Sequence, residues 1–260
     1  MKVKVTIGDG PLVLAQPHGG VEIPQSIHNR LNPVGRAMED TDWHITRLYD
    51  DLIDNVTVVS TPVHRFVIDA NRDPSDASLY PGQNTTSLCP TITFDGQPIY
   101  LEGEEPGEDE INERRQQYHQ PYHDALREQV ERVNQKHGYV ILYDCHSIRS
   151  RVPYLFDGKL PDFNIGTNSG QSCDSQIEAV VEGICAREKK YSSVVNGRFK
   201  GGWTTRHYGK PEAGFHAMQM ELAQCTYMQE NAPWLYDASK ADKLRVVLRN
   251  ILRGILEFQG

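Results

Sequence analysis

Residues 140–151 constrain the fold of this chain more than any other stretch of its sequence. Residues 140–143 form a short apolar, β-rich run that follows a polar helical pattern, which predicts a buried strand. Asp144 and His146 come directly after this run, and Arg149 and Arg151 follow them. Because ligands of open α/β sheets bind beyond the carboxyl ends of the strands, this stretch predicts a site for an anionic substrate. The alternative is that Asp144 caps the next segment and His146 is a buried structural histidine.

The same alternation of strand and helix patterns extends over the whole chain. Apolar β-rich runs lie at residues 12–15, 56–60, 66–68 and 216–223, and amphipathic helical patterns lie at 39–54, 110–136, 174–188 and from 239 onward. The helix over 110–136 is expected to bend near Pro121. The irregular, Gly- and Pro-rich residues 75–110 are expected to line or cover a site. At 260 residues, this pattern predicts one α/β catalytic domain over residues 1–260.

Composition limits the partners and the compartment of the protein. The net charge of −8 and the pI near 5.7 argue against nucleic acid or an acidic membrane as a partner, so a local cluster of cations must capture any anion. No apolar run has the length of a signal peptide core or a membrane span. Five widely spaced cysteines without a Cys-x-x-Cys pair are typical of reduced thiols, which predicts a cytoplasmic protein.

Two further strand ends carry side chains suited to a metal and a carboxylate. Residues 12–15 lead into Pro17-His18-Gly19-Gly20, where the glycines permit close approach of a ligand and His18 is a candidate metal ligand that Glu22 could join. Residues 66–68 lead into Asp69-Ala70-Asn71-Arg72, where the amide and the guanidinium suit a substrate carboxylate. A Gly-rich turn and an Asx turn are the structural alternatives.

Acidic residues supply the remaining catalytic candidates. Asp40 and Asp42 stand before the apolar stripe of the helix expected over 39–54, so each is a candidate N-cap or metal ligand. Glu221 lies in the strand expected over 216–223, where a buried carboxylate requires a partner, which predicts a general base. The alternative for Glu221 is an outward-facing acid on an edge strand.

A basic loop and a histidine pair complete the candidates. Residues 194–209 bring Arg198, Lys200 and Arg206 together with several glycines, a composition that favours an anion pocket over a plain basic surface loop. His119 and His123 lie four residues apart on one expected helix, but no carboxylate partner in the pattern makes them a second metal site.

Taken together, these motifs resemble the N-formylglutamate amidohydrolase family, which acts in histidine degradation. The resemblance covers nearly the whole chain and rests on seven motifs in order: Pro17-His18-Gly19-Gly20, Asp40-Thr41-Asp42-Trp43-His44, Asp69-Ala70-Asn71-Arg72, Tyr143-Asp144-Cys145-His146-Ser147, the stretch 196–202, Thr205-Arg206-His207-Tyr208-Gly209, and Met220-Glu221-Leu222. The family is similar to zinc carboxypeptidases and aspartoacylases. That similarity implies a zinc-carboxypeptidase-like fold with a mixed, mostly parallel sheet flanked by helices.

The resemblance also implies roles for individual residues. His18 and His146 would bind zinc, Glu221 would activate water, and Asn71-Arg72 would bind a substrate carboxylate. The His-x-x-Glu spacing of carboxypeptidases is absent, since position 21 is Val. Asp40 is therefore expected as the third ligand, with Glu22 and Asp42 as alternatives.

The expected activity is zinc-dependent hydrolysis of N-formyl-L-glutamate to L-glutamate and formate. Arg149 or Arg72 would stabilise the oxyanion, and the cations Arg72, Arg198, Lys200 and Arg206 would bind the two substrate carboxylates, with no cation assigned to either one. His and carboxylate ligands also admit iron, cobalt or manganese. A hydrolase of another N-acyl amino acid or small peptide and a non-catalytic anion-binding protein are the alternatives. The sequence does not predict an oligomeric state.

Overall fold

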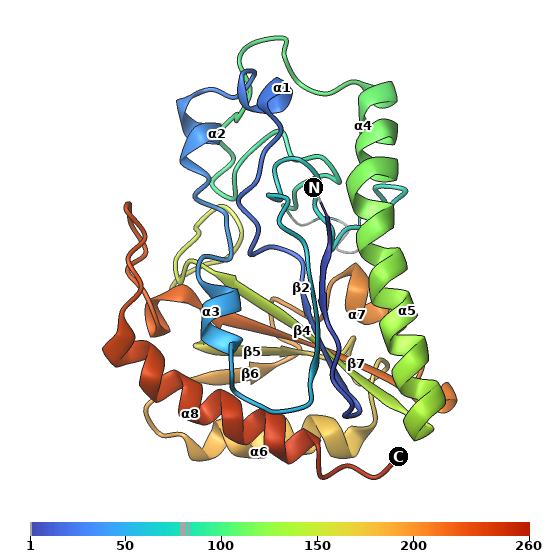
Figure 1. Cartoon of the computed structure of the whole chain (residues 1–260). Coiled ribbons are helices and arrows are strands. Elements are labelled where there is room, and N and C mark those ends of the chain that lie inside the picture. The colour runs from blue at the N-terminus through green and yellow to red at the C-terminus, as the bar shows by residue number, and fades with distance from the viewer. Residues whose placement is uncertain (1, 79–81, 83) are drawn as a thin grey trace.

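A seven-stranded sheet forms the centre of the computed structural model, which describes residues 2–78, 82 and 84–260 (Figure 1). Its strands are β1 (Lys4–Thr6), β2 (Leu12–Gln16), β3 (Thr57–Ser60), β4 (Val140–Ile148), β5 (Phe163–Gly166), β6 (Ser193–Val195) and β7 (Phe215–Ala223), in the order β1-β3-β2-β4-β7-β5-β6. The pairs β2/β3, β2/β4, β4/β7 and β5/β6 are parallel, whereas β1/β3 and β5/β7 are antiparallel. The expectation of a mixed, mostly parallel sheet is confirmed.

Helices cover both faces of this sheet (Figure 1). The α-helices of the described chain are α1 (Gln25–His28), α2 (Pro33–Ala37), α3 (Ile45–Tyr49), α4 (Glu108–Arg114), α5 (Gln120–His137), α6 (Ser175–Arg187), α7 (Trp203–Tyr208) and α8 (Ala238–Ile255). Of these, α5 covers one face of the sheet, and α3, α6 and α8 cover the other (Figure 1). Leu12 and Leu14 of β2 belong to a core with α3, α6 and α8, while Val13 and Ala15 pack with α5 on the opposite face. Alternate residues of one strand are therefore buried on both sides, as is typical of parallel strands. No helix in the described part of the chain is long and apolar enough to cross a membrane.

The long strands β4 and β7 place the catalytic candidates next to each other. β4 extends to Ile148, so Asp144 and His146 lie inside the strand and not beyond its end as expected. The reason is pairing with β7 along its whole length, which brings His146 beside Glu221. β7 lies between β4 and β5, so Glu221 stands on an inner strand and the edge-strand alternative is wrong.

The strand expected over residues 66–68 is absent. The three side chains are buried, but their backbone forms turns in which Phe66 N–H donates to His64 Nδ1 and Val67 N–H donates to His64 O. A short apolar run has the same periodicity in a buried turn as in a strand, so its sequence could not separate the two.

The helix expected over residues 39–54 shortens to α3. His44, Asp51 and Asn55 adopt left-handed backbone conformations with φ of 61°, 52° and 59°, which a continuing α-helix cannot contain. The apolar stripe is nevertheless buried, with Ile45 and Leu48 both 0% exposed. These apolar side chains still reach the core, because the short helix and the turns on either side of it face the same way.

The long helix expected over residues 110–136 is present from Glu108 to His137, with a π-helical turn over Arg115–His119 in place of a bend at Pro121. Gln120 N–H donates to Arg115 O, five residues back. Pro121 has no N–H and its ring clashes with a regular preceding turn, so a wider turn directly before it relieves the conflict.

Candidate active site

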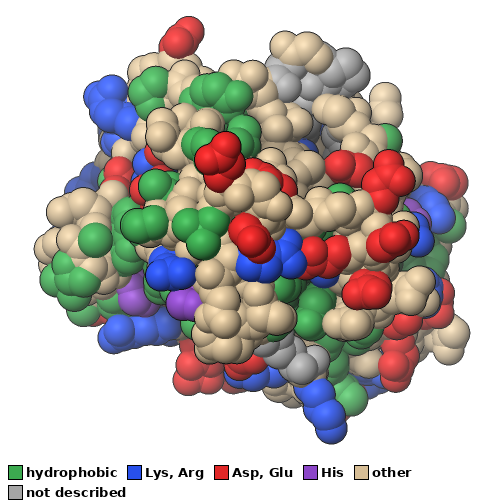
Figure 2. All heavy atoms as spheres, turned by 90° about the horizontal axis from the view of Figure 1, so that it is seen from above, with side chains coloured by type: hydrophobic (Ala, Val, Ile, Leu, Met, Phe, Trp, Pro, Cys, Tyr) green, Lys and Arg blue, Asp and Glu red, His purple; other side chains and the backbone are tan. Residues whose placement is uncertain are grey.

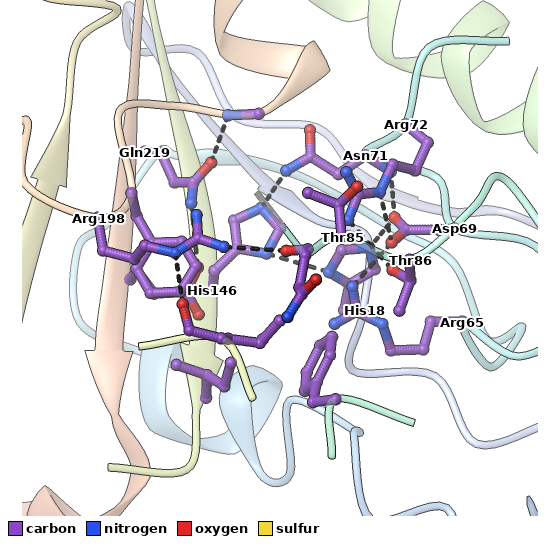
Figure 3. A pocket seen from close by; sticks show the side chains of 17 residues that line it. His18, Arg65, Asp69, Asn71, Arg72, Thr85, Thr86, His146, Arg198 and Gln219 are labelled. Atoms are coloured by element: carbon purple, nitrogen blue, oxygen red, sulfur yellow. Dashed lines mark hydrogen bonds and ion pairs between the residues drawn. The ribbon is translucent and has the colours of Figure 1, made fainter. Parts of the chain in front are cut away.

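One pocket collects most of the predicted site residues at the carboxyl end of the central strands (Figure 3). It is lined by residues from six segments: His18, Arg65, Asp69, Asn71, Arg72, Asn84, Thr85, Thr86, Phe94, His146, Ile148, Leu155, Arg198, Phe199, Gly202, Gln219 and Glu221. Asn84–Thr86 and Phe94 come from the irregular segment expected to line or cover a site. Residues 79–81 and 83 of that segment lie outside the described residues.

His18, Asp42 and His146 point potential metal-ligand atoms at one another. The distances are 3.1 Å between the two Nδ1 atoms, 3.3 Å from His146 Nδ1 to Asp42 Oδ2, and 4.0 Å from His18 Nδ1 to the same oxygen. Zinc bonds of about 2.0–2.1 Å in a tetrahedral site separate neighbouring ligand atoms by roughly 3.3 Å. All three residues are buried, and within the described ranges they form the one such group.

The outer nitrogens of both imidazoles face carboxylates. His18 Nε2 lies 2.6 Å from Asp69 Oδ1, and His146 Nε2 lies 2.9 Å from Asp144 Oδ2. Metal-binding histidines commonly donate their second N–H to a carboxylate, which leaves the inner nitrogen unprotonated for the metal. Both imidazoles are therefore oriented as metal ligands would be.

The charge balance of this region also suits a divalent cation. The buried carboxylates of Asp42, Asp69, Asp144 and Glu221 surround the two histidines. Burial raises the pKa of Glu221 to about 8, and the charge of Asp42 adds to this rise. Burial lowers the pKa of His146, but the carboxylates of Asp144, Asp42 and Glu221 outweigh burial and raise it well above its ordinary value. A metal ion would offset this excess of negative charge.

Asp42 occupies the position that the sequence assigned first to Asp40. Asp42 Oδ2 accepts a 2.9 Å hydrogen bond from Ser147 N–H beside His146. Asp40 instead accepts a hydrogen bond from Phe94 N–H at 2.7 Å and lies 3.4 Å from Arg149 Nη2, and burial raises its pKa to about 7. The alternative Glu22 is exposed and pairs with Val63 through its backbone. The structure thus brings Asp42, and neither Asp40 nor Glu22, to the two histidines.

Glu221 faces the pocket from β7 and is 7% exposed. Its Oε2 accepts a 3.0 Å hydrogen bond from Gln219 Nε2, and Gln219 Oε1 accepts one from Gly202 N–H at 2.7 Å (Figure 3). The amide of Gln219 therefore connects the carboxylate of Glu221 to the loop before α7.

Asn71 and Arg72 lie in the pocket, as the sequence predicts. Asn71 Oδ1 accepts a hydrogen bond from Thr204 N–H, and Asn71 Nδ2 lies 3.0 Å from His146 Nε2. Arg72 Nη2 donates to Thr86 Oγ1 at 3.1 Å. The amide of Asn71 therefore stands beside His146, and the guanidinium of Arg72 lines the same pocket.

A protein-family model described as N-formylglutamate amidohydrolase matches residues 10–228. The chain belongs to this family. It is 46% identical to the N-formylglutamate deformylase of Pseudomonas aeruginosa over 96% of this chain and 94% of that protein. It is 45% identical to the enzyme of the same name from Pseudomonas putida over 95% and 92% of the two chains. The solved structure of an N-formylglutamate amidohydrolase from Ralstonia eutropha superposes with a TM-score of 0.79 at 25% identity, covering 97% of both chains.

Not every cation that the family resemblance suggested reaches the pocket. Arg72 and Arg198 do, and Arg198 donates from Nε to Leu155 O and from Nη2 to Asn84 O. Lys200 and Arg206 are absent from the described lining, and Arg206 Nε donates to Gly201 O. On the face seen in Figure 2, acidic and basic side chains are interspersed.

Arg149, expected to stabilise an oxyanion, lies outside the described pocket lining. Its Nη2 is 2.7 Å from Asp95 Oδ2, and this ion pair and Asp40 hold the turn that carries Phe94. Arg65, which the sequence reading missed, is in the pocket and only 7% exposed. The sequence feature that could have identified Arg65 is its position directly before the apolar run 66–68, because a buried cation requires partners.

Arg65 joins the buried carboxylates. Its Nη2 lies 2.8 Å from Asp69 Oδ2, its Nη1 lies 3.5 Å from Asp42 Oδ1, and its guanidinium lies 4.6 Å from the ring centroid of Phe94. One cation thus contacts both a candidate metal ligand and the carboxylate that orients His18.

Glycines of two family motifs allow other protein segments to approach closely. A Cβ atom on Gly20 would lie 2.4 Å from the carbonyl carbon of Pro62, and one on Gly202 would lie 2.4 Å from Asn71 Nδ2. Gly202 therefore lets the start of α7 close onto Asn71. That the glycines after His18 also permit close approach of a ligand stays a prediction.

Cys145 lies beside His146 in β4, but its side chain is buried in the α8-side core and is absent from the described pocket lining. Burial raises the pKa of its thiol well above the ordinary value, so the reactive thiolate is disfavoured.

Proposed function

We propose that this chain hydrolyses N-formyl-L-glutamate to L-glutamate and formate. The observation that carries the proposal is one pocket that joins a His18–Asp42–His146 group, a buried Glu221 and the guanidiniums of Arg72 and Arg198. The names of the two Pseudomonas relatives, each more than 40% identical over most of the chain, support the same substrate.

We further propose that His18, Asp42 and His146 hold one zinc ion. The ligand-atom distances, the carboxylates behind both imidazoles and the excess negative charge support this assignment. When bound, the metal would polarise the formyl oxygen and lower the pKa of a water molecule at the site far below its value in bulk water, towards ~7. Iron, cobalt or manganese would fit the same donor set.

Glu221 is the general base in this proposal. Its carboxylate takes the proton of the attacking water and delivers it to the departing amine of glutamate, a contribution of roughly a hundredfold to ten-thousandfold in rate. The hydrogen bond from Gln219 Nε2 orients this carboxylate towards the pocket. A nearby dication favours the ionised form that the base requires.

The arginine side chains of the pocket have two proposed roles: binding the substrate carboxylates and stabilising the oxyanion. Arg72 and Arg198 are proposed to bind the two substrate carboxylates, with Asn71 assisting Arg72. Arg65, in place of Arg149, is proposed to stabilise the negative charge that develops on the formyl oxygen, because it is the buried cation at the histidine end of the pocket. A cytoplasmic location and a place at the end of histidine degradation also belong to this proposal.

Formate release from N-formyl-L-glutamate tests the proposal in three states of the protein: as purified, stripped by chelator, and restored with zinc. We expect activity to disappear and return. Turnover that survives complete metal removal would overturn the metal assignment. Faster turnover of N-acetylglutamate or of other N-formyl amino acids would favour the alternative substrates, and binding of N-formylglutamate without turnover would favour an anion-binding protein.

A further inference from the structure

His119 and His123 occupy a position that the proposed reaction does not use. Both project from the helical segment Arg115–His137, neither is in the described pocket lining, and their ring centroids are 4.4 Å apart. Both are almost fully buried, at 3% and 5% exposure. Burying two imidazoles requires partners for their nitrogens.

Those partners are backbone carbonyls on either side of Asn71. His123 Nε2 lies 2.7 Å from Ala70 O, and His119 Nε2 lies 3.0 Å from Arg72 O. Because a carbonyl only accepts, each Nε2 carries the proton and donates it. His123 Nδ1 lies 3.2 Å from Tyr208 Oη, a hydroxyl that can donate to it, which is consistent with this tautomer.

The π-helical turn accounts for this pairing. It ends at His119, and an extra residue in the turn rotates the following helix relative to a regular continuation. Such turns are frequent at functional sites. The π-helical turn thus lies directly before Pro121, where the sequence predicted a bend, and both His119 and His123 contact the backbone of residues 70–72.

The start of α7 holds the same segment from another side. Trp203 N–H donates to Asn71 O at 3.3 Å, and its ring contacts His123 edge-on at a centroid distance of 4.5 Å. Asp69 accepts from the backbone of the segment as well, through Oδ1 from Asn71 N–H and through its carbonyl from Arg72 N–H. The carbonyls of Ala70, Asn71 and Arg72 are therefore all hydrogen-bonded.

We propose that His119 and His123 are positioning residues that fix Asn71 and Arg72 in the orientation that binds a substrate carboxylate. We call this pair the histidine clamp. The inference rests on the proposed function, in which Asn71 and Arg72 meet that carboxylate. A displacement of these two side chains should weaken substrate binding more than the chemical step, because neither side chain is a proposed metal ligand or the base.

The test compares donor-removing and donor-keeping variants. His119→Leu and His123→Leu remove the N–H while filling the space, and we expect each to raise KM for N-formylglutamate about tenfold with a change in kcat under about threefold. His119→Gln and His123→Gln place an amide N–H near the original Nε2 and should restore KM to within about threefold of the parent. His207→Leu is the matched control, because His207 stacks on Trp203 at 4.2 Å but is not a donor to either carbonyl in the described structure.

A double-mutant cycle separates positioning from general destabilisation. In an Arg72→Ala background, His119→Leu should change KM by less than about twofold, because the group that it positions is gone. Additive effects of the two substitutions, or equal losses in the Leu and Gln variants, would overturn the inference. If the parent protein releases no formate, the proposed function fails instead. Calorimetry with L-glutamate then tests the histidine clamp separately: the Leu variants should bind it more weakly than the Gln variants, and equal affinities would overturn the inference.

Discussion

Asp42 and Asp40 show how two buried carboxylates only two residues apart acquire different chemistry. Asp42 is directed at His18 and His146, whereas Asp40 anchors Phe94 N–H and lies near Arg149. Met38 has a left-handed backbone conformation and residues 39–44 form turns, not a helix. The side chains of Asp40 and Asp42 can therefore point in different directions.

This contrast predicts different outcomes for a matched pair of variants. Asp42→Asn should lose stoichiometric zinc and lower formate release by at least about a hundredfold, since a neutral amide is a poor ligand for the ion. Asp40→Asn should keep its zinc, because its carboxylate does not reach the histidines. Zinc content by elemental analysis, alongside activity, checks both. Loss of zinc from Asp40→Asn alone would reverse our assignment.

Glu221 yields the second prediction at the scale of residues. Glu221→Gln keeps the size of the side chain but removes the base, so kcat should fall roughly a hundredfold to ten-thousandfold while zinc content stays unchanged. Steady-state kinetics with elemental analysis of the same sample measures both. A variant that retains more than about a third of parental kcat would exclude Glu221 as the base.

At the scale of elements, the connection from β3 into the pocket depends on a neutral histidine. His64 is fully buried; its Nδ1 accepts from Phe66 N–H at 3.1 Å, and its Nε2 lies 2.9 Å from Thr41 Oγ1. Burial lowers the pKa of His64 to about 3, and the neighbouring charge of Arg65 contributes to the same shift. This imidazole holds the turn that delivers Arg65 and Asp69 to the site.

Stability should therefore fall in acid because of His64. In the unfolded chain His64 takes up a proton near pH 6.5, but in the folded state only near pH 3, so the unfolded state binds more protons between these values. The contribution of His64 to the free energy of unfolding should decrease as the pH falls below about 6.5. Urea unfolding of metal-free protein from pH 8 to 5 measures the decrease.

The control for this prediction is His64→Asn. Its side-chain oxygen can still accept from the backbone N–H two residues on, but it has no group that titrates in this range. The variant should show a flatter dependence of unfolding free energy on pH than the parent. Identical slopes in the two proteins would assign the acid sensitivity to another group.

At the scale of the whole molecule, the proposed metal connects separate parts of the fold. Its ligands come from the loop after β2, the segment before α3, and β4, while the carboxylates behind the imidazoles belong to the segment after β3 and to β4. The buried carboxylates around them repel one another without a cation. Metal binding should thus stabilise the fold as well as supply chemistry.

Thermal unfolding tests that connection. Zinc at about a thousand times its dissociation constant should add about 4 kcal/mol to the free energy of unfolding, which corresponds to roughly 10 °C in Tm for a chain of this size. Differential scanning calorimetry with and without chelator measures the shift. His146→Ala, as the control, should show little response to zinc, and an equal response in both proteins would place the metal elsewhere.

Much of the fold could be predicted because its signals are local. The strand patterns at residues 12–15, 56–60, 140–143 and 216–223 and the helix patterns at 174–188 and from 239 correspond to β2, β3, β4, β7, α6 and α8. The predictions at 66–68 and 39–54 were wrong because burial of an apolar stripe does not reveal the backbone that carries it. Asp51 and Asn55 belong to residue types that tolerate the left-handed conformation, but their sequence does not oblige them to adopt it.

The sequence by itself determined which chemical groups this protein has for a site: two histidines, a late glutamate and an Asn-Arg pair. Only the tertiary structure decided which carboxylate joins the histidines and which cations enter the pocket. Distances across Asp42, Arg65 and His146 depend on contacts between segments up to 104 residues apart, as between Asp42 and His146. Spacing along the chain cannot encode such distances, because turns, strand register and packing between segments set them.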